Sequence, residues 1–131
     1  MTTPLDTWER ALRSRVAAAL PRVTVVIGAL PAKPDRALAV KAYADPVPAD
    51  PADTTRRIRF QVRTRQDPAA TPPTANADAE TAQEALLGHG LTLLDGAPQA
   101  RITHLSTATL GLDSDGRDER TDNYLLLTTR D

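Results

Sequence analysis

Apolar positions change their spacing along the chain, and each change marks an expected element. From residue 4 to residue 20 they recur every three or four positions, which is the period of a helix with one buried face. We expect Thr3 to cap this helix, Pro4 to be its first residue and Pro21 to end it. The run 23–27 consists only of β-branched residues and predicts a strand.

Period-2 alternation then predicts a sheet. Residues 37–43 alternate weakly, and we expect them to form a hairpin with 23–27 across a turn-rich connection at 28–36. The segment 55–65 holds the cleanest alternation in the chain, so it predicts a third strand.

The second half of the chain predicts one more helix and further strands. Asn76 is the expected cap of a helix that continues to about Leu87 and ends at the glycines 88 and 90. Three strands are expected after it: 91–94, 101–110 and 121–130. The Asp-Ser-Asp-Gly sequence at 113–116 predicts a turn between the last two.

Helices set against a sheet of this order predict an α+β fold. We expect a single small domain over residues 1–131, in which a mainly antiparallel sheet packs against two helices. Two proline-rich segments, 45–53 and 67–75, interrupt the pattern, and we expect them to be flexible loops.

Composition excludes several classes of protein. The 131 residues include no cysteine and two histidines, so neither a disulfide framework nor a thiolate metal site is expected. No apolar run is long enough to span a membrane, and no secretory leader is expected. Aromatic residues make up 3% of the chain, so the core is small, and we expect packing on copies or partners to add stability.

No catalytic, metal or cofactor site is expected. The sequence lacks the nucleophile, metalloprotease and phosphate-loop motifs. The acids at 113–122 do not fit a calcium loop, because Arg117 stands at the fifth position, where such a loop has an acid. His104 is expected to be an ordinary strand residue.

Charge is unevenly distributed along a chain whose net charge is −1. In the third strand the apolar residues Ile58, Phe60 and Val62 predict an inward face. The opposite face then carries most of an arginine stripe, formed by Arg56, Arg57, Arg59, Arg63 and Arg65. The segment 113–122 has a local excess of acids. It contains Asp113, Asp115, Arg117, Asp118, Glu119, Arg120 and Asp122.

Three interpretations of the stripe remain open. It is a solvated sheet face, or it pairs with the acidic segment of a neighbouring subunit in a head-to-tail assembly, or it contacts nucleic acid. The missing interleaved aromatic residues disfavour the last. The candidate interface residues are Arg57, Arg59, Arg63, Arg65, Asp113, Asp115, Arg117, Asp118, Glu119 and Arg120.

One run of residues near the C-terminus has a familiar pattern. Residues 110–127 contain a Leu-Gly turn, an Asp-Gly, an Arg, a Glu-Arg pair, an Asp-Asn-Tyr and a closing apolar strand. This run resembles the tail terminator proteins of long-tailed bacteriophages, which are also called minor capsid or head–tail connector proteins. The segments 30–36 and 60–65 resemble a loop and the central strand of the same family.

The resemblance implies a non-enzymatic virion protein without cofactors, made in the host bacterial cytoplasm. Such proteins form a homo-oligomeric ring of six at the head–tail junction, where the ring terminates the tail tube. The implied partners are further copies of the chain, the tail tube protein and a head-completion or connector protein. DNA would pass through the lumen without specific binding, and no membrane is involved. The alternatives are a small nucleic-acid-binding module or a host scaffold or binding module.

Overall fold

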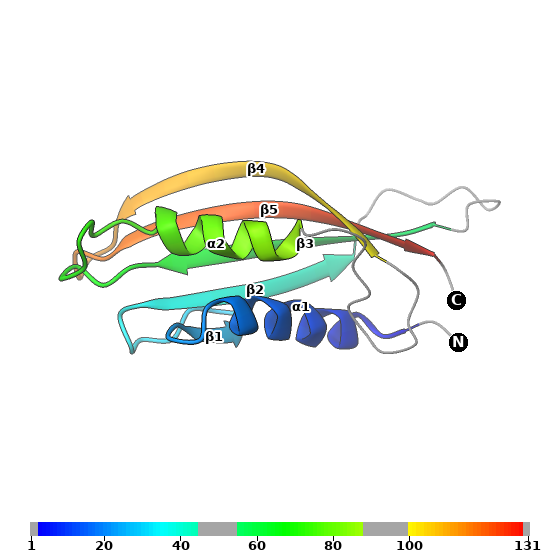
Figure 1. Cartoon of the computed structure of the whole chain (residues 1–131), viewed down its shortest axis with the longest axis horizontal. Coiled ribbons are helices and arrows are strands. Elements are labelled where there is room, and N and C mark those ends of the chain that lie inside the picture. The colour runs from blue at the N-terminus through cyan, green and yellow to red at the C-terminus, as the bar shows by residue number, and fades with distance from the viewer. Residues whose placement is uncertain (1–2, 45–54, 88–99, 130–131) are drawn as a thin grey trace.

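A single sheet with both helices on one face forms the molecule (Figure 1). The computed structural model describes residues 3–44, 55–87 and 100–129. Its elements are α1 (Leu5–Ala19), β1 (Thr24–Ile27), β2 (Ala37–Ala44), β3 (Thr55–Arg65), α2 (Asn76–Leu86), β4 (Ala100–Leu112) and β5 (Asp118–Thr129). The expected α+β fold with a mostly antiparallel sheet is confirmed. The expected strand 91–94, the glycines 88 and 90, and the loop 45–53 lie outside the described residues.

The five strands lie in the order β1-β2-β3-β5-β4. All neighbours are antiparallel except β1 and β2, which run parallel with Thr24 beside Ala37. The expected hairpin between these two segments was therefore wrong. A strand of four residues is only about 13 Å long. The nine-residue connection 28–36 is therefore long enough to return the chain to the same end of the sheet.

The core lies between the helices and the inner face of the sheet. From α1, Trp8, Leu12 and Val16 are almost fully buried, as expected for residues spaced one turn apart. The predicted inward face of β3 is confirmed, because Ile58, Phe60 and Val62 are at most 1% exposed. Phe60 stacks on Tyr124 of β5 with ring centroids 4.9 Å apart.

Neither helix begins with the expected side-chain cap. Pro4, not Thr3, is the N-cap of α1, and its carbonyl accepts the first hydrogen bonds of the helix. The N-cap of α2 is Ala75, so Asn76 is the first helical residue. The Asn76 side chain instead accepts a hydrogen bond of 3.2 Å from Arg120 of β5. In α2, a tertiary contact has thus taken the side chain that was expected to cap the helix.

The long β4–β5 hairpin confirms the turn at 113–116. The Gly116 amide donates to the Asp113 carbonyl at 3.0 Å. Gly116 has a φ of 75°, a conformation that favours glycine. Two register shifts in β4 leave Leu105 and Leu110 as extra residues, and the side chains of both are exposed.

The two edges of the sheet differ. The Arg13 guanidinium donates to the Val25 carbonyl at 3.0 Å, so a side chain of α1 covers part of the β1 edge. Beyond the end of β1, the buried Glu9 carboxylate accepts the Ala42 amide at 2.7 Å. The opposite edge, β4, lies beyond α2 (Figure 1).

Candidate subunit and partner interface

The arginine stripe lies on the sheet face that the helices do not cover, which we call the outer face. Successive residues of a strand point to opposite faces, so the inward Ile58 and Val62 place Arg57, Arg59 and Arg63 on the outer face. Arg63 is exposed, and Arg57 and Arg59 are partly exposed. The predicted alternation is confirmed for these three side chains.

Arg65 shares this face but is buried, at 4% exposure. Its guanidinium donates hydrogen bonds of 2.7 Å to the carbonyl oxygens of Pro31, Pro34 and Asp35. The expectation of an exposed Arg65 was wrong, because the connection 28–36 folds over it. Arg56 has the opposite orientation, and its guanidinium bonds the Thr3 carbonyl.

Arg63 and Glu119, one from each of the two candidate charge segments, pair within the chain. The Arg63 Nε lies 2.7 Å from a Glu119 carboxylate oxygen. The Glu119 side chain is 10% exposed and that of Arg63 is 47% exposed. β3 and β5 are neighbours in register, so the basic strand and the acidic segment meet inside one subunit.

The acids of the hairpin turn converge on Arg117, which is itself buried. Its guanidinium lies 2.8 Å from Asp113, 3.2 Å from Asp35 and 3.3 Å from Asp115. Hydrogen bonds from the Arg117 backbone amide and guanidinium lower the pKa of Asp113. Asp118 lies next to this cluster, and its carboxylate accepts the Ala75 amide at 2.8 Å. Asp115, at 72% side-chain exposure, is the most exposed of these acids.

Three loops are cross-braced at one end of the molecule. We call this the loop-bearing end, formed by residues 28–36, 66–75 and 113–117, and it lies opposite the two termini (Figure 1). Arg117 also donates to the Ala32 carbonyl at 2.8 Å, which ties the hairpin turn to the first loop. The Gln66 backbone amide donates to the Asp118 carbonyl at 3.0 Å and connects the second loop to β5. Hydrogen bonds between distant segments therefore connect the loops of this end.

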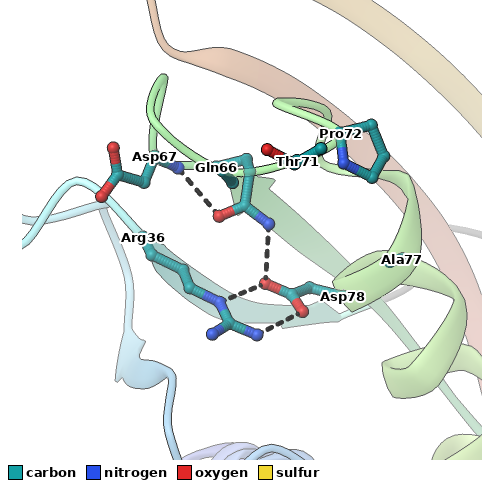
Figure 2. Close-up of a pocket in the computed structure, with 8 residues that line it drawn as sticks. Arg36, Gln66, Asp67, Thr71, Pro72, Ala77 and Asp78 are labelled. Atoms are coloured by element: carbon teal, nitrogen blue, oxygen red, sulfur yellow. Dashed lines mark hydrogen bonds and ion pairs between the residues drawn. The ribbon is translucent and has the colours of Figure 1, made fainter.

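Figure 2 shows the residues that line a pocket at this end, between the end of the first loop, the second loop and α2. The pocket has a volume of about 350 Å³. The Arg36 guanidinium makes two hydrogen bonds of 2.8 Å with the nearly buried Asp78 carboxylate. Gln66 donates to the same carboxylate at 3.4 Å. The hydrogen bond with Asp78 raises the pKa of Arg36. These groups satisfy one another and fix the start of α2.

A buried polar cluster on β4 and β5 was missed by the sequence analysis. Asp122 is fully buried and accepts hydrogen bonds from Thr107 at 2.6 Å and from two nitrogens of Arg120 at 3.1 Å. His104 lies 2.9 Å from the same carboxylate and packs edge-on against Tyr124. Desolvation opposes ionisation of Asp122, but the hydrogen bonds outweigh it and lower its pKa. Burial raises the pKa of Tyr124.

The spacing of two residues in the sequence could have indicated this cluster. Residues two apart on a strand share a face, so Arg120 and Asp122 were bound to be neighbours. His104 is a partly buried strand residue, as expected, and its contacts join two strands.

Over the described ranges, no group of three or more His, Cys, Asp or Glu side chains is arranged to hold a metal ion. In the same part of the chain, no helix is long and apolar enough to cross a membrane.

A family model for bacteriophage tail terminator proteins matches residues 6–130. The chain belongs to the bacteriophage tail terminator family. The tail terminator also resembles a solved chain described as "Virion of native gene transfer agent (GTA) particle", with a TM-score of 0.61 and 18% identity. That match covers 92% of this chain and 93% of the other. A second solved chain matches with a TM-score of 0.55 and 17% identity over 92% and 91% of the two chains. Both likenesses show a shared fold. No curated protein sequence matches.

Family membership confirms the resemblance inferred from the C-terminal run and makes this tail terminator a structural component of the phage tail and virion. The segments that carried the resemblance, 30–36, 60–65 and 110–127, meet at the loop-bearing end through Arg65 and Arg117.

Proposed function

We propose that this tail terminator forms a closed ring of six copies at the head-proximal end of the tail tube. The ring stops tube polymerisation and joins the tail to the head connector, so it contacts both the tube protein and a head-completion protein. DNA passes through its lumen. The chain is made in the host cytoplasm, acts at the head–tail junction and catalyses no reaction. The family match over residues 6–130 is the observation that carries this proposal.

The two sides of the protomer support a ring. A closed ring uses heterologous contacts, in which two different surfaces of each subunit meet. The β4 edge exposes three leucines, Leu105, Leu110 and Leu112, the last at 69% exposure. On the opposite edge, a side chain of α1 covers part of β1. Exposed apolar side chains along a strand edge are typical of a surface that another chain buries.

The proposed interface residues are those of the basic strand and the hairpin end. They are Arg57, Arg59, Arg63, Arg65, Asp113, Asp115, Arg117, Asp118, Glu119 and Arg120. Within this set, Arg65, Arg117 and Arg120 are buried and act by holding loops and strands in place. The exposed members, such as Arg63 and Asp115, are the ones that can reach a neighbouring molecule.

The decisive experiment is electron microscopy of assembled tails that carry a labelled tail terminator. We expect a single ring of label at the head-proximal end, with six copies per tail counted from the label. One copy per tail, or label spread along the tube, would overturn the proposal. Free protein is a weaker sample, since ring closure can require the tube as a template.

A further inference from the structure

Charge on the outer face is strongly one-sided. Cross-strand pairing places five exposed or partly exposed cations on it: Lys41, Arg57, Arg59, Arg63 and Arg101. Among the described strand residues of this face, Glu119 is the single carboxylate. The net charge of −1 for the whole chain hides this concentration.

The cations stand on three strands, around a neutral polar centre. The Gln61 amide donates to Asn123 at 3.3 Å, and Asn123 donates to Ser106 at 3.1 Å, which makes a ladder from β3 across β5 to β4. The apolar Leu125 of this face is buried. A typical protein interface has an apolar centre and a polar rim, whereas phosphate contacts use cations and neutral polar donors. The outer face, with its cations around a neutral polar centre, resembles a phosphate-contacting surface.

The segment 113–122 of a second copy offers few free acids to these cations. Glu119 already pairs with Arg63 of its own subunit. Asp113 and Asp118 accept hydrogen bonds within the loop-bearing end, and Asp122 is fully buried. The acid segment is therefore largely occupied inside the chain that carries it.

We propose that the outer face is a contact surface for the phosphate backbone of duplex DNA, without sequence specificity. Exposed Lys41 and Arg101 supply the phosphate contacts. Single-strand binding platforms use successive stacking aromatics, and here Tyr43 is the one exposed aromatic among the described residues of the face. In the proposed ring this surface lines the lumen, and that location alone rests on the proposed function.

The test compares two variants with the same change in charge. Lys41→Gln with Arg101→Gln removes two cations from the outer face. Arg10→Gln with Arg22→Gln removes two exposed cations from elsewhere on the molecule. Binding of a fluorescent duplex of about 30 base pairs is followed by anisotropy from about 50 to 200 mM salt, a range over which phosphate contacts weaken steeply. Thermal melts confirm that both variants are folded.

The outer-face variant should lose about tenfold or more in affinity at the low-salt end, and the salt slope should fall by about 2. The control variant should keep nearly all of its affinity. Absence of duplex binding by the natural chain would overturn the proposal, as would equal losses in both variants. Tighter binding of polyglutamate than of the duplex would also overturn it, because the surface would then be one for acidic proteins. None of these results depends on the copy number in assembled tails, so the proposed DNA contact and the proposed ring are tested independently.

Discussion

At the residue scale, side chains complete the hydrogen bonding of backbone that the strands leave unpaired. Glu9 takes the place of a strand beside Ala42 where β1 has ended. The Arg65 guanidinium donates hydrogen bonds to three carbonyl groups of the connection 28–36, which no strand pairs. A buried backbone group without a partner is costly, so these side chains determine where the short elements can stop.

Glu9 gives the simplest test of this role. Glu9→Ala leaves the Ala42 amide buried without its acceptor and should lower the free energy of unfolding by about 1–3 kcal/mol. Glu9→Gln keeps an acceptor oxygen at the same place and should lose clearly less. Urea denaturation followed by circular dichroism measures both. Equal losses would show that packing of the side chain, and not the hydrogen bond, is what matters.

Asp122 makes the free energy of unfolding depend on pH. Its pKa is lower in the folded chain than the ordinary value of 3.8, so its contribution is present above that value. The contribution is lost as the pH falls through the lower folded pKa. Asp122→Asn removes the buried carboxylate partner of Arg120 and leaves it the mostly exposed Glu80 at 3.8 Å, so the variant should lose about 3–5 kcal/mol at neutral pH. It should also flatten the decline in stability below about pH 4, which the ordinary carboxyl pKa sets.

Asp115→Asn is the matched control, since its side chain is 72% exposed. Urea midpoints for both variants between neutral and acidic pH provide the measurement. If the two variants behaved alike, the buried cluster would contribute nothing specific to stability.

At the element scale, the alternation of apolar residues was sufficient to place most strands. It identified the inward residues Ile58 and Phe60 and the outward Arg63. It could not give the direction of β1 relative to β2, because both directions put the same side chains inward. The alternation also could not predict the bulges at Leu105 and Leu110, since a bulge depends on the register of β4 with β5.

The sequence identified most residues of the candidate site, but it did not predict which of them contact one another. Alternation gave the outward face of Arg63, but its pairing with Glu119 follows from the register of β3 and β5, which lie 56 residues apart at this contact. Arg65 was assigned the right face and the wrong environment, because a loop distant in sequence covers it. Burial of this kind is a tertiary property that no local pattern records.

The bracing of the first loop can be measured. Arg65→Met removes the charged hydrogen bonds that a buried guanidinium donates to three carbonyl groups of the connection 28–36, and it should cost at least about 2 kcal/mol. Amide hydrogen exchange in residues 28–36 should also accelerate. Arg63→Met, the control, loses a half-exposed ion pair and should cost about 0–1 kcal/mol. Unchanged exchange in the loop of the Arg65 variant would contradict this role.

At the scale of the whole molecule, the ends and faces have distinct characters. The loop-bearing end is held together by hydrogen bonds between its loops, the outer face is basic and polar, and the β4 edge carries three exposed leucines. Composition could not reveal this division, because the charges nearly cancel over the chain as a whole.

Assembly should change the proline-rich loops. We expect at least one of the segments 45–53 and 67–75 to lie at the contact with the tube or connector, and to become more protected there. Hydrogen exchange of free protein and of assembled tails would show slower exchange in that segment. The buried face of α1 around Leu12 serves as the internal reference. Identical exchange of both loops in the two samples would remove them from the interface.

Trp8 has a practical consequence for all of these measurements. It is the only tryptophan in the chain and is 1% exposed, at the contact between α1 and the sheet. Indole emission shifts to longer wavelength when the ring enters water, so this residue is a built-in optical reporter of the core. A ligand or neighbour bound at the outer face or the β4 edge lies away from it. Its emission therefore reports unfolding separately from assembly, with no label attached.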